Sequence, residues 1–64
     1  MVKVNGEFVK IDGKSVSEYI ESANYDKSRV AVELNGNILP KSEYDHTHLQ
    51  NGDSVEIVSF VGGG

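Results

Sequence analysis

Four turn-forming dipeptides divide this chain of 64 residues into short segments. Each of them pairs an asparagine or an aspartate with a glycine: Asn5-Gly6, Asp12-Gly13, Asn35-Gly36 and Asn51-Gly52. Glycine adopts positive φ without strain, and asparagine and aspartate tolerate it, so such pairs favour tight turns. The chain is therefore expected to form short elements, with hairpins wherever alternating apolar residues flank a turn.

Alternating apolar and polar residues predict five short strands. The expected ranges are residues 2–5 and 8–11 around Asn5-Gly6, 30–34 and 38–39 around Asn35-Gly36, and 54–60 near the end of the chain. Pro40 limits the fourth strand to the edge of a sheet, because proline has no N–H to donate. In the last strand Val55 and Ile57 share one face, and Val58 and Phe60 share the opposite face.

Between the second and third strands the apolar period changes to about 3.6 residues, which predicts one helix near residues 16–24. Ser15 and Glu18 have the spacing of a capping box at its start. The order β-β-α-β-β indicates an α+β fold in which one helix packs on a mixed sheet. The predicted domain spans residues 1–61 and is followed by a flexible glycine tail, residues 62–64.

The predicted core consists of the apolar residues on the inner faces of these elements. It comprises Val2, Val4, Val9, Ile11, Val16, Ile20, Val30, Val32, Leu34, Val55 and Ile57, with Tyr44 and Leu49 as anchors from the irregular segment between the last two strands.

Length and composition exclude several classes of function. A domain of this size buries only about 60% of the surface of its unfolded chain, so an enzyme with a buried cofactor is not expected and no catalytic residue is assigned. The absence of cysteine excludes disulfides and thiolate metal sites. Ten acidic against six basic residues disfavour nucleic-acid binding. Without a long apolar run, neither a signal peptide nor a membrane span is expected, and the cytoplasm is the expected location.

The two histidines lie in a polar segment, at positions 46 and 48. A metal site there would need more ligands than Glu43 and Asp45 provide, so no metal site is predicted. Ser42, His46 and Asp45 could be read as a catalytic triad, but neither a nucleophile elbow nor an oxyanion hole accompanies them. Solvent-exposed loop histidines are the favoured interpretation.

The end of the chain combines three glycines with nearby exposed apolar residues. Glycine has no Cβ, so Gly62-Gly63-Gly64 could enter a channel too narrow for other residues, and its terminal carboxylate could be activated as an acyl adenylate. Phe8, Val58 and Phe60 are expected to be exposed and to form a docking face for a partner that receives the tail. The pattern alone leaves open two simpler readings, a frayed end and scattered surface residues.

The whole chain resembles the ThiS family of sulfur carriers in thiamine biosynthesis, which belong to the ubiquitin-like β-grasp proteins. The matching segments are Val4-Asn5-Gly6, Val30-Ala31-Val32-Glu33-Leu34-Asn35-Gly36 with Ile38 and Pro40, Asn51-Gly52-Asp53, Val55-Glu56-Ile57-Val58, and Val61-Gly62-Gly63-Gly64. Tyr44 stands where the family often has tryptophan. The resemblance implies a β-grasp domain over residues 1–61.

The resemblance also implies a protein co-substrate that is not itself an enzyme. An E1-like enzyme of the ThiF type would use ATP and Mg²⁺ to adenylate the carboxylate of Gly64, and sulfur from a donor enzyme would then replace AMP. The resulting thiocarboxylate would supply sulfur to a thiazole synthase of the ThiG type. Gly62 and Gly63 complete the tail motif, and the carrier itself would bind no cofactor. A carrier like the small subunit of molybdopterin synthase, or a non-covalent ubiquitin-like interaction module, remains the alternative.

Overall fold

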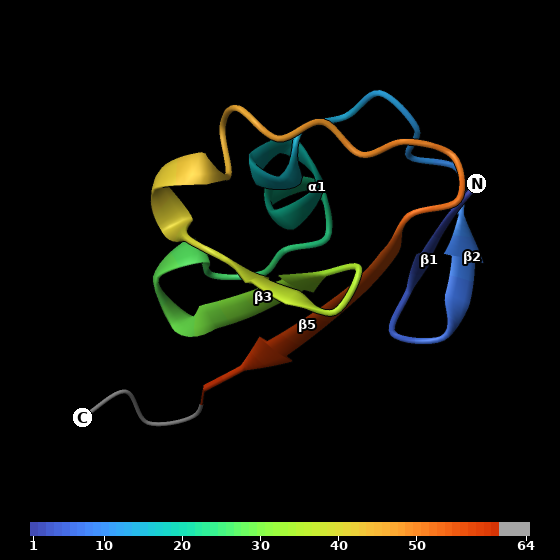
Figure 1. The fold of residues 1–64 in the computed structure, drawn as a ribbon. Coiled ribbons are helices and arrows are strands. Elements are labelled where there is room, and N and C mark those ends of the chain that lie inside the picture. The colour runs from blue at the N-terminus through green and yellow to red at the C-terminus, as the bar shows by residue number, and fades with distance from the viewer. Residues whose placement is uncertain (61–64) are drawn as a thin grey trace.

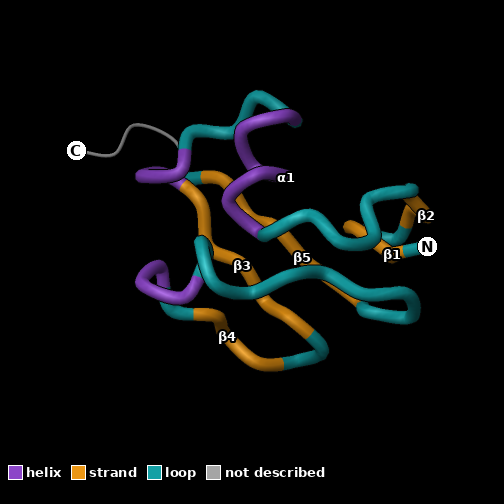
Figure 2. The backbone as a smooth tube through the Cα atoms, turned by 90° about the horizontal axis from the view of Figure 1, so that it is seen from above, coloured by secondary structure: helices purple, strands orange, loops and turns teal. Residues whose placement is uncertain are grey.

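The structure, a computed structural model, describes residues 1–60. Its strands are β1 (Val2–Val4), β2 (Glu7–Val9), β3 (Val30–Leu34), β4 (Asn37–Leu39) and β5 (Ser54–Ser59). Its helices are α1 (Val16–Ser22) and two short 3₁₀ helices, η1 (Lys27–Arg29) and η2 (Lys41–Glu43). Figures 1 and 2 show that α1 lies on one side of the sheet.

The strands form one mixed sheet in the order β2-β1-β5-β3-β4. β1 and β5 run parallel in its interior, whereas the other neighbouring strands are antiparallel. One helix on a mixed sheet confirms the predicted fold class. β2 is shorter than predicted, because its pairing with β1 ends where Val9 meets Val2, beside the first residue of the chain.

The helix begins as predicted and ends earlier. The Glu18 amide donates to the Ser15 hydroxyl at 3.1 Å, and the Ser15 amide donates to the Glu18 carboxylate at 2.8 Å, which confirms the capping box. Asn24 has a φ of 62°, so it leaves the helical conformation. The amides of Asn24 and Tyr25 then donate to the carbonyls of Glu21 and Ile20, which closes the helix in a Schellman motif.

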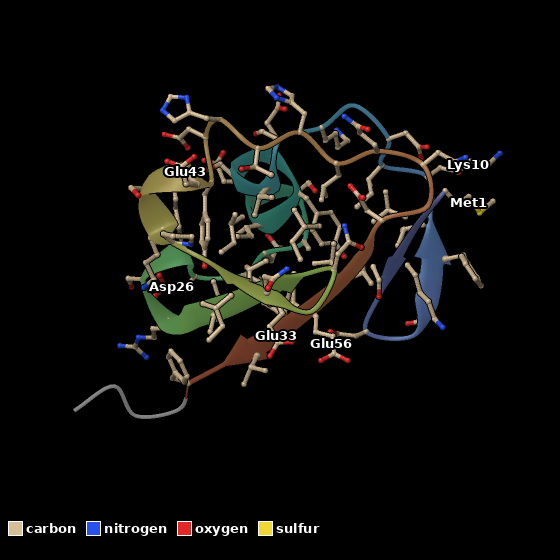
Figure 3. All side chains as sticks on the ribbon, viewed as in Figure 1. Met1, Lys10, Asp26, Glu33, Glu43 and Glu56 are labelled. Atoms are coloured by element: carbon tan, nitrogen blue, oxygen red, sulfur yellow. The ribbon has the colours of Figure 1, made fainter. Side chains whose placement is uncertain are left out.

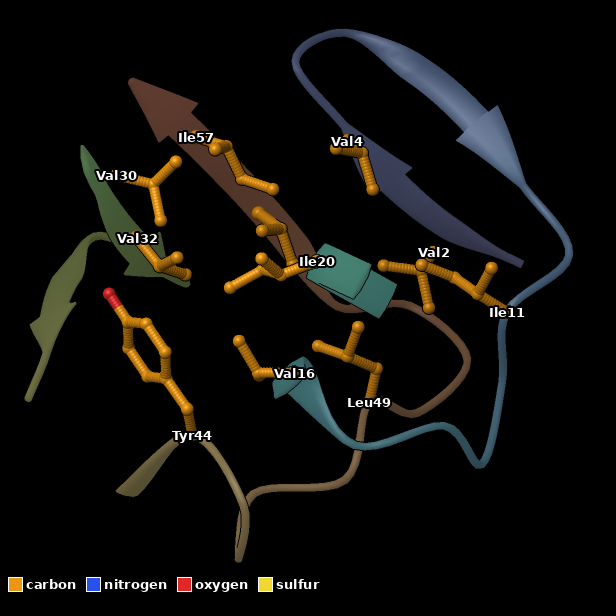
Figure 4. Close-up of a cluster of buried hydrophobic side chains, with 11 residues drawn as sticks. Val2, Val4, Ile11, Val16, Ile20, Val30, Val32, Tyr44, Leu49 and Ile57 are labelled. Carbon is orange, nitrogen blue, oxygen red and sulfur yellow. The ribbon is translucent and has the colours of Figure 1, made fainter. Parts of the chain in front are cut away.

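The core lies between α1 and the inner face of the sheet (Figure 4). Its buried members are Val2, Val4, Ile11, Val16, Ile20, Val30, Val32, Tyr44, Leu49, Val55 and Ile57. Of the predicted core, Val9 and Leu34 are only partly buried, because they lie on an edge strand and at the end of a strand. Tyr44 and Leu49 come from the segment that leads from β4 to β5, and each is 1% exposed, as predicted.

Two asparagines join the hairpins to β5. Asn5 and Asn35 have φ values of 49° and 51°, in agreement with the predicted turns. The Asn5 carboxamide accepts from the Ile57 N–H at 2.8 Å and donates to the Ile57 carbonyl at 3.2 Å. The Asn35 carboxamide accepts from the Ser54 N–H at 2.9 Å. The side chains of both turns therefore hold the backbone of β5, whose last residue precedes the glycine tail by three positions in the sequence.

Candidate functional site

The side of the sheet that faces away from α1, here called the outer face, carries large exposed apolar side chains. Phe8, Ile38, Val58 and Phe60 are between 52% and 76% exposed. On β5, Val55 and Ile57 are buried on the side that faces the helix. This alternation confirms the predicted orientation of β5, in which Val58 and Phe60 point away from the core.

The strand register shows how three of these apolar residues lie relative to one another. Val58 lies opposite Ala31 of β3, and the Phe60 amide donates to the Arg29 carbonyl at 2.7 Å. Two residues earlier on β5, Glu56 lies opposite Glu33 of β3, and Glu33 lies opposite Ile38 of β4. Val58 and Phe60 therefore share the outer face at the C-terminal end of β5, and Ile38 lies two strand spacings from Val58 and two residues back along the sheet. We call these three residues the apolar patch.

Phe8 lies in a different part of the outer face. It pairs with Lys3 on β1, and Lys3 pairs with Ser54 at the start of β5. Four residues along β5 and two strand spacings separate this position from Val58, about 13 Å along the sheet and about 10 Å across it. The Lys3 ammonium lies 5.8 Å from the centre of the Phe8 ring, within the range of a cation–π contact. The structure confirms that Phe8 is exposed but places it away from Val58 and Phe60.

Ile38 is not among the docking residues predicted from the sequence. The signal that could have identified it is the two-residue turn Asn35-Gly36, which sets the register of the hairpin. Because Glu33 points outward from β3, its partner on β4 points outward as well. The outward orientation of Ile38, which at 76% is the most exposed large apolar side chain within residues 1–60, follows directly from that register.

The residues around the two histidines form structural contacts. The Asp45 carboxylate accepts a hydrogen bond from the Ser17 hydroxyl and pairs with the Lys27 ammonium at 3.0 Å. These two contacts, the Ser17 hydrogen bond first, hold the pKa of Asp45 below its usual range. Within residues 1–60, no group of three or more potential metal ligands comes together. The hydrogen bonds of Asp45 thus join the start of α1 to the segment after β4.

The predicted sulfur-carrying residue, Gly64, and the tail residues Gly62 and Gly63 lie outside the described residues. No helix in the described part of the chain is long and apolar enough to cross a membrane.

Comparison with known proteins gives a consistent result along the entire chain. The model of the ThiS family matches residues 1–64. The sulfur carrier protein ThiS of Bacillus subtilis is 36% identical over 66 residues, which cover 100% of both chains. A crystal structure of the thiamine biosynthesis protein ThiS from Geobacter metallireducens superposes with a TM-score of 0.78 at 34% identity. That likeness covers 98% of this chain and 97% of the other, and it supports the β-grasp assignment.

A third relative is much longer. A thiazole synthase of Paramagnetospirillum magneticum is 39% identical over 62 residues, which are 95% of this chain. The matched segment is 19% of that protein, so the chain spans about a fifth of this relative's length.

Proposed function

The chain belongs to the ThiS family, and from this membership we propose that it carries sulfur on the carboxylate of Gly64 for thiazole formation in thiamine biosynthesis. The full-length likeness to a protein named as a sulfur carrier is the observation that supports the proposal most strongly. In this role the chain is a co-substrate of other proteins and not an enzyme, and it works in the cytoplasm.

The proposed chemistry takes place at the end of the tail. An α-carboxylate is ionised at neutral pH, because its reference pKa is about 3.3–3.7, and it can attack the α-phosphate of ATP. Pyrophosphate leaves, and an acyl adenylate forms at Gly64. Sulfide supplied by a donor enzyme then attacks the acyl carbon, AMP leaves, and a thiocarboxylate remains. An E1-like adenylating enzyme of the ThiF type supplies the ATP and Mg²⁺ sites and positions the reacting groups.

The acceptor of the sulfur is a thiazole synthase of the ThiG type. The match between this chain and part of a protein named thiazole synthase supports an association of the two. The apolar patch at the end of β5 supports docking of a partner beside the tail, because clustered exposed apolar side chains are typical of interaction surfaces.

Mass spectrometry tests the proposed chemistry directly. With ATP, Mg²⁺, the E1-like enzyme and a sulfur source, the intact chain should gain the mass difference between one sulfur and one oxygen atom, located on Gly64. Gly64→Val should fold normally but remain unconverted, because a Cβ obstructs a narrow channel and restricts φ. Equal conversion of both chains, or sulfur on another residue, would refute the carrier function.

Two further variants separate carrying from docking. Removal of Gly63 and Gly64 should abolish sulfur transfer but keep partner binding over the outer face, whereas a purely non-covalent module would keep its whole activity. Phe60→Asp should weaken binding of the E1-like enzyme without changing the tail. Phe8→Asp is the matched control, because it makes the same change on the same face outside the apolar patch, and it should weaken binding less.

A further inference from the structure

Three asparagines of this chain precede a glycine, and the structure holds one of them differently from the other two. Asn5-Gly6, Asn35-Gly36 and Asn51-Gly52 all form turns. Asn-Gly pairs are prone to spontaneous deamidation, because glycine leaves the backbone nitrogen unhindered and flexible enough to reach the asparagine side chain. The contacts of each carboxamide therefore decide which pair reacts in the folded chain.

The carboxamides of Asn5 and Asn35 are held by the backbone of β5, the central strand of the sheet. The Asn5 carboxamide bonds to both the N–H and the carbonyl of Ile57. The Asn35 carboxamide accepts from the Ser54 N–H at 2.9 Å and donates to the Asp53 carboxylate at 3.1 Å. Because β5 lies between β1 and β3, releasing either side chain from it requires a costly opening of the sheet.

The exposed pair Asn51-Gly52 is held by Met1 instead. The Met1 ammonium donates to the Asn51 carboxamide oxygen, and the Gly52 N–H donates to the Met1 carbonyl at 2.9 Å. The same ammonium pairs with the Asp12 carboxylate at 3.3 Å. Figure 3 shows Met1 beside the segment that leads into β5. Within residues 1–60, the Asn51 side chain has no other hydrogen-bond partner.

Movement of Met1 therefore frees both reacting groups at once. Met1 lies outside β1 and is 49% exposed, and residues beyond the ends of regular structure fray at low free-energy cost. Such movement releases the Asn51 carboxamide and the Gly52 nitrogen while the sheet stays intact. We infer that Asn51 is the residue that deamidates in the folded protein, through a cyclic imide with the Gly52 nitrogen. This modification is independent of the proposed sulfur chemistry.

The reaction needs only base and water. Base removes the proton of the Gly52 amide, and the nitrogen attacks Cγ of Asn51. The new N–Cγ bond replaces the Cγ–Nδ2 bond, and ammonia leaves with a proton taken from solvent. Water then opens the imide: cleavage of the N–Cγ bond yields aspartate, and cleavage between the nitrogen and the backbone carbonyl carbon of Asn51 yields isoaspartate. No oxidant or reductant takes part.

The test follows the intact protein in mildly alkaline buffer by mass spectrometry, with tandem spectra to locate each change. The wild type should gain the mass difference between a hydroxyl and an amino group. This gain should occur at Asn51 at least about tenfold faster than at Asn5 or Asn35, a factor that corresponds to the net free energy of about one hydrogen bond. In concentrated urea the three asparagines should react at similar rates, because the fold no longer distinguishes them.

Two variants test the role of Met1. Asp12→Ala should speed the reaction at Asn51, because it removes the carboxylate that holds the Met1 ammonium. The rate at Asn35 should stay at its wild-type value, which would show that the sheet has not opened. Glu43→Ala is the matched control: it also removes one exposed carboxylate, but Figure 3 shows Glu43 far from Met1, so the rate at Asn51 should not change.

A third variant tests the site itself. Asn51→Gln should show no mass gain on the same timescale in native buffer, because glutamine would have to close a less favourable six-membered ring. The inference is wrong if Asn5 or Asn35 converts as fast as Asn51 in native buffer, or if the folded chain gains no mass while the urea-treated chain does. It is also wrong if Asp12→Ala and Glu43→Ala change the rate at Asn51 to the same extent.

Discussion

At the scale of single residues, Asn5 meets two requirements that no other residue type meets together. Its φ of 49° lies in the left-handed region, which glycine and asparagine occupy with least strain. Its carboxamide offers both a donor and an acceptor to the N–H and carbonyl of Ile57. The backbone N–H of Asn5 also donates to the Val55 carbonyl at 2.9 Å. The side chain therefore continues the pairing of β1 with β5 beyond the last residue of β1.

Substitution of Asn5 by glycine should isolate the value of the carboxamide. Asn5→Gly keeps the turn but leaves the Ile57 N–H and carbonyl without their partner, so it should lower the free energy of unfolding by about 1–3 kcal/mol. Asn24→Gly is the control: φ is also positive there, and within residues 1–60 its side chain takes part in no hydrogen bond. It should change stability by less than about 0.5 kcal/mol. Urea denaturation of both variants measures the difference, and equal losses would contradict this role of Asn5.

The sequence predicts the turn at Asn5 but not its contact with Ile57. The pair Asn5-Gly6 needs only local steric preferences to be recognised. The hydrogen bonds to Ile57 join residues 52 positions apart and exist only because β5 inserts next to β1. No local pattern carries that information.

At the scale of elements, α1 depends strongly on its first turn, because it has only seven residues. Helices this short are marginal in isolation, so capping and packing must stabilise them. The Ser15 amide and hydroxyl both bond to Glu18 and hold the pKa of that carboxyl below its usual range, the backbone amide contributing most.

Ser15→Ala should remove the hydroxyl half of the capping box and lower the free energy of unfolding by about 1 kcal/mol. The affected donor is the Glu18 amide, which would then have to bond to water. Ser22→Ala is a suitable control, because its hydroxyl only donates to the Tyr19 carbonyl at the other end of the helix. Thermal denaturation that showed no difference between the two variants would contradict the importance of the cap.

The contact between α1 and the segment after β4 should depend on pH. The Ser17 hydroxyl and then the Lys27 ammonium lower the pKa of Asp45 in the folded chain. A lowered pKa stabilises the fold at pH values above the ordinary range of aspartate, and this contribution is lost as pH falls through the folded value. Asp45→Asn should therefore destabilise the protein at pH 7 and make progressively less difference towards acid pH. A stability difference that is constant with pH would contradict this assignment.

Elements differ in how well the sequence predicts them. The start of α1 is predictable because Ser15 and Glu18 form a local motif, whereas its end is two residues earlier than predicted because Asn24 adopts the left-handed conformation. Just beyond the end of the helix, Tyr25 packs against the core. The orientation of Ile38 could have been predicted, since it depends only on the hairpin register.

At the scale of the whole molecule, the strand order determines which exposed residues can act together. Phe8 resembles Val58 and Phe60 in being apolar and exposed, but it lies two strand spacings and four residues away from Val58. Periodicity predicts that each of them faces outward and says nothing about their distance. The first and last of the described strands, β1 and β5, pair in parallel. Only the complete fold brings these two strands together.

The division of β5 into a core face and an outer face should allow stability and docking to be changed separately, and adjacent residues provide the sharpest test. Ile57 and Val58 are both β-branched, so substitution by aspartate changes strand propensity similarly. Ile57 is 7% exposed and Val58 57% exposed. A domain of this size has a free energy of unfolding of about 3–10 kcal/mol. The free-energy cost of burying an unpaired carboxylate in its core should exceed that value.

Ile57→Asp should therefore leave the chain largely unfolded by circular dichroism. Val58→Asp should keep the wild-type spectrum but bind the E1-like enzyme more weakly, because it places a charge in the apolar patch beside Glu56. Sulfur loading of Val58→Asp should recover at high enzyme concentration, since the tail is unchanged. If Val58→Asp unfolded like Ile57→Asp, the two faces of β5 would not be separable. If it folded and bound as tightly as the wild type, docking would have to take place elsewhere on the domain.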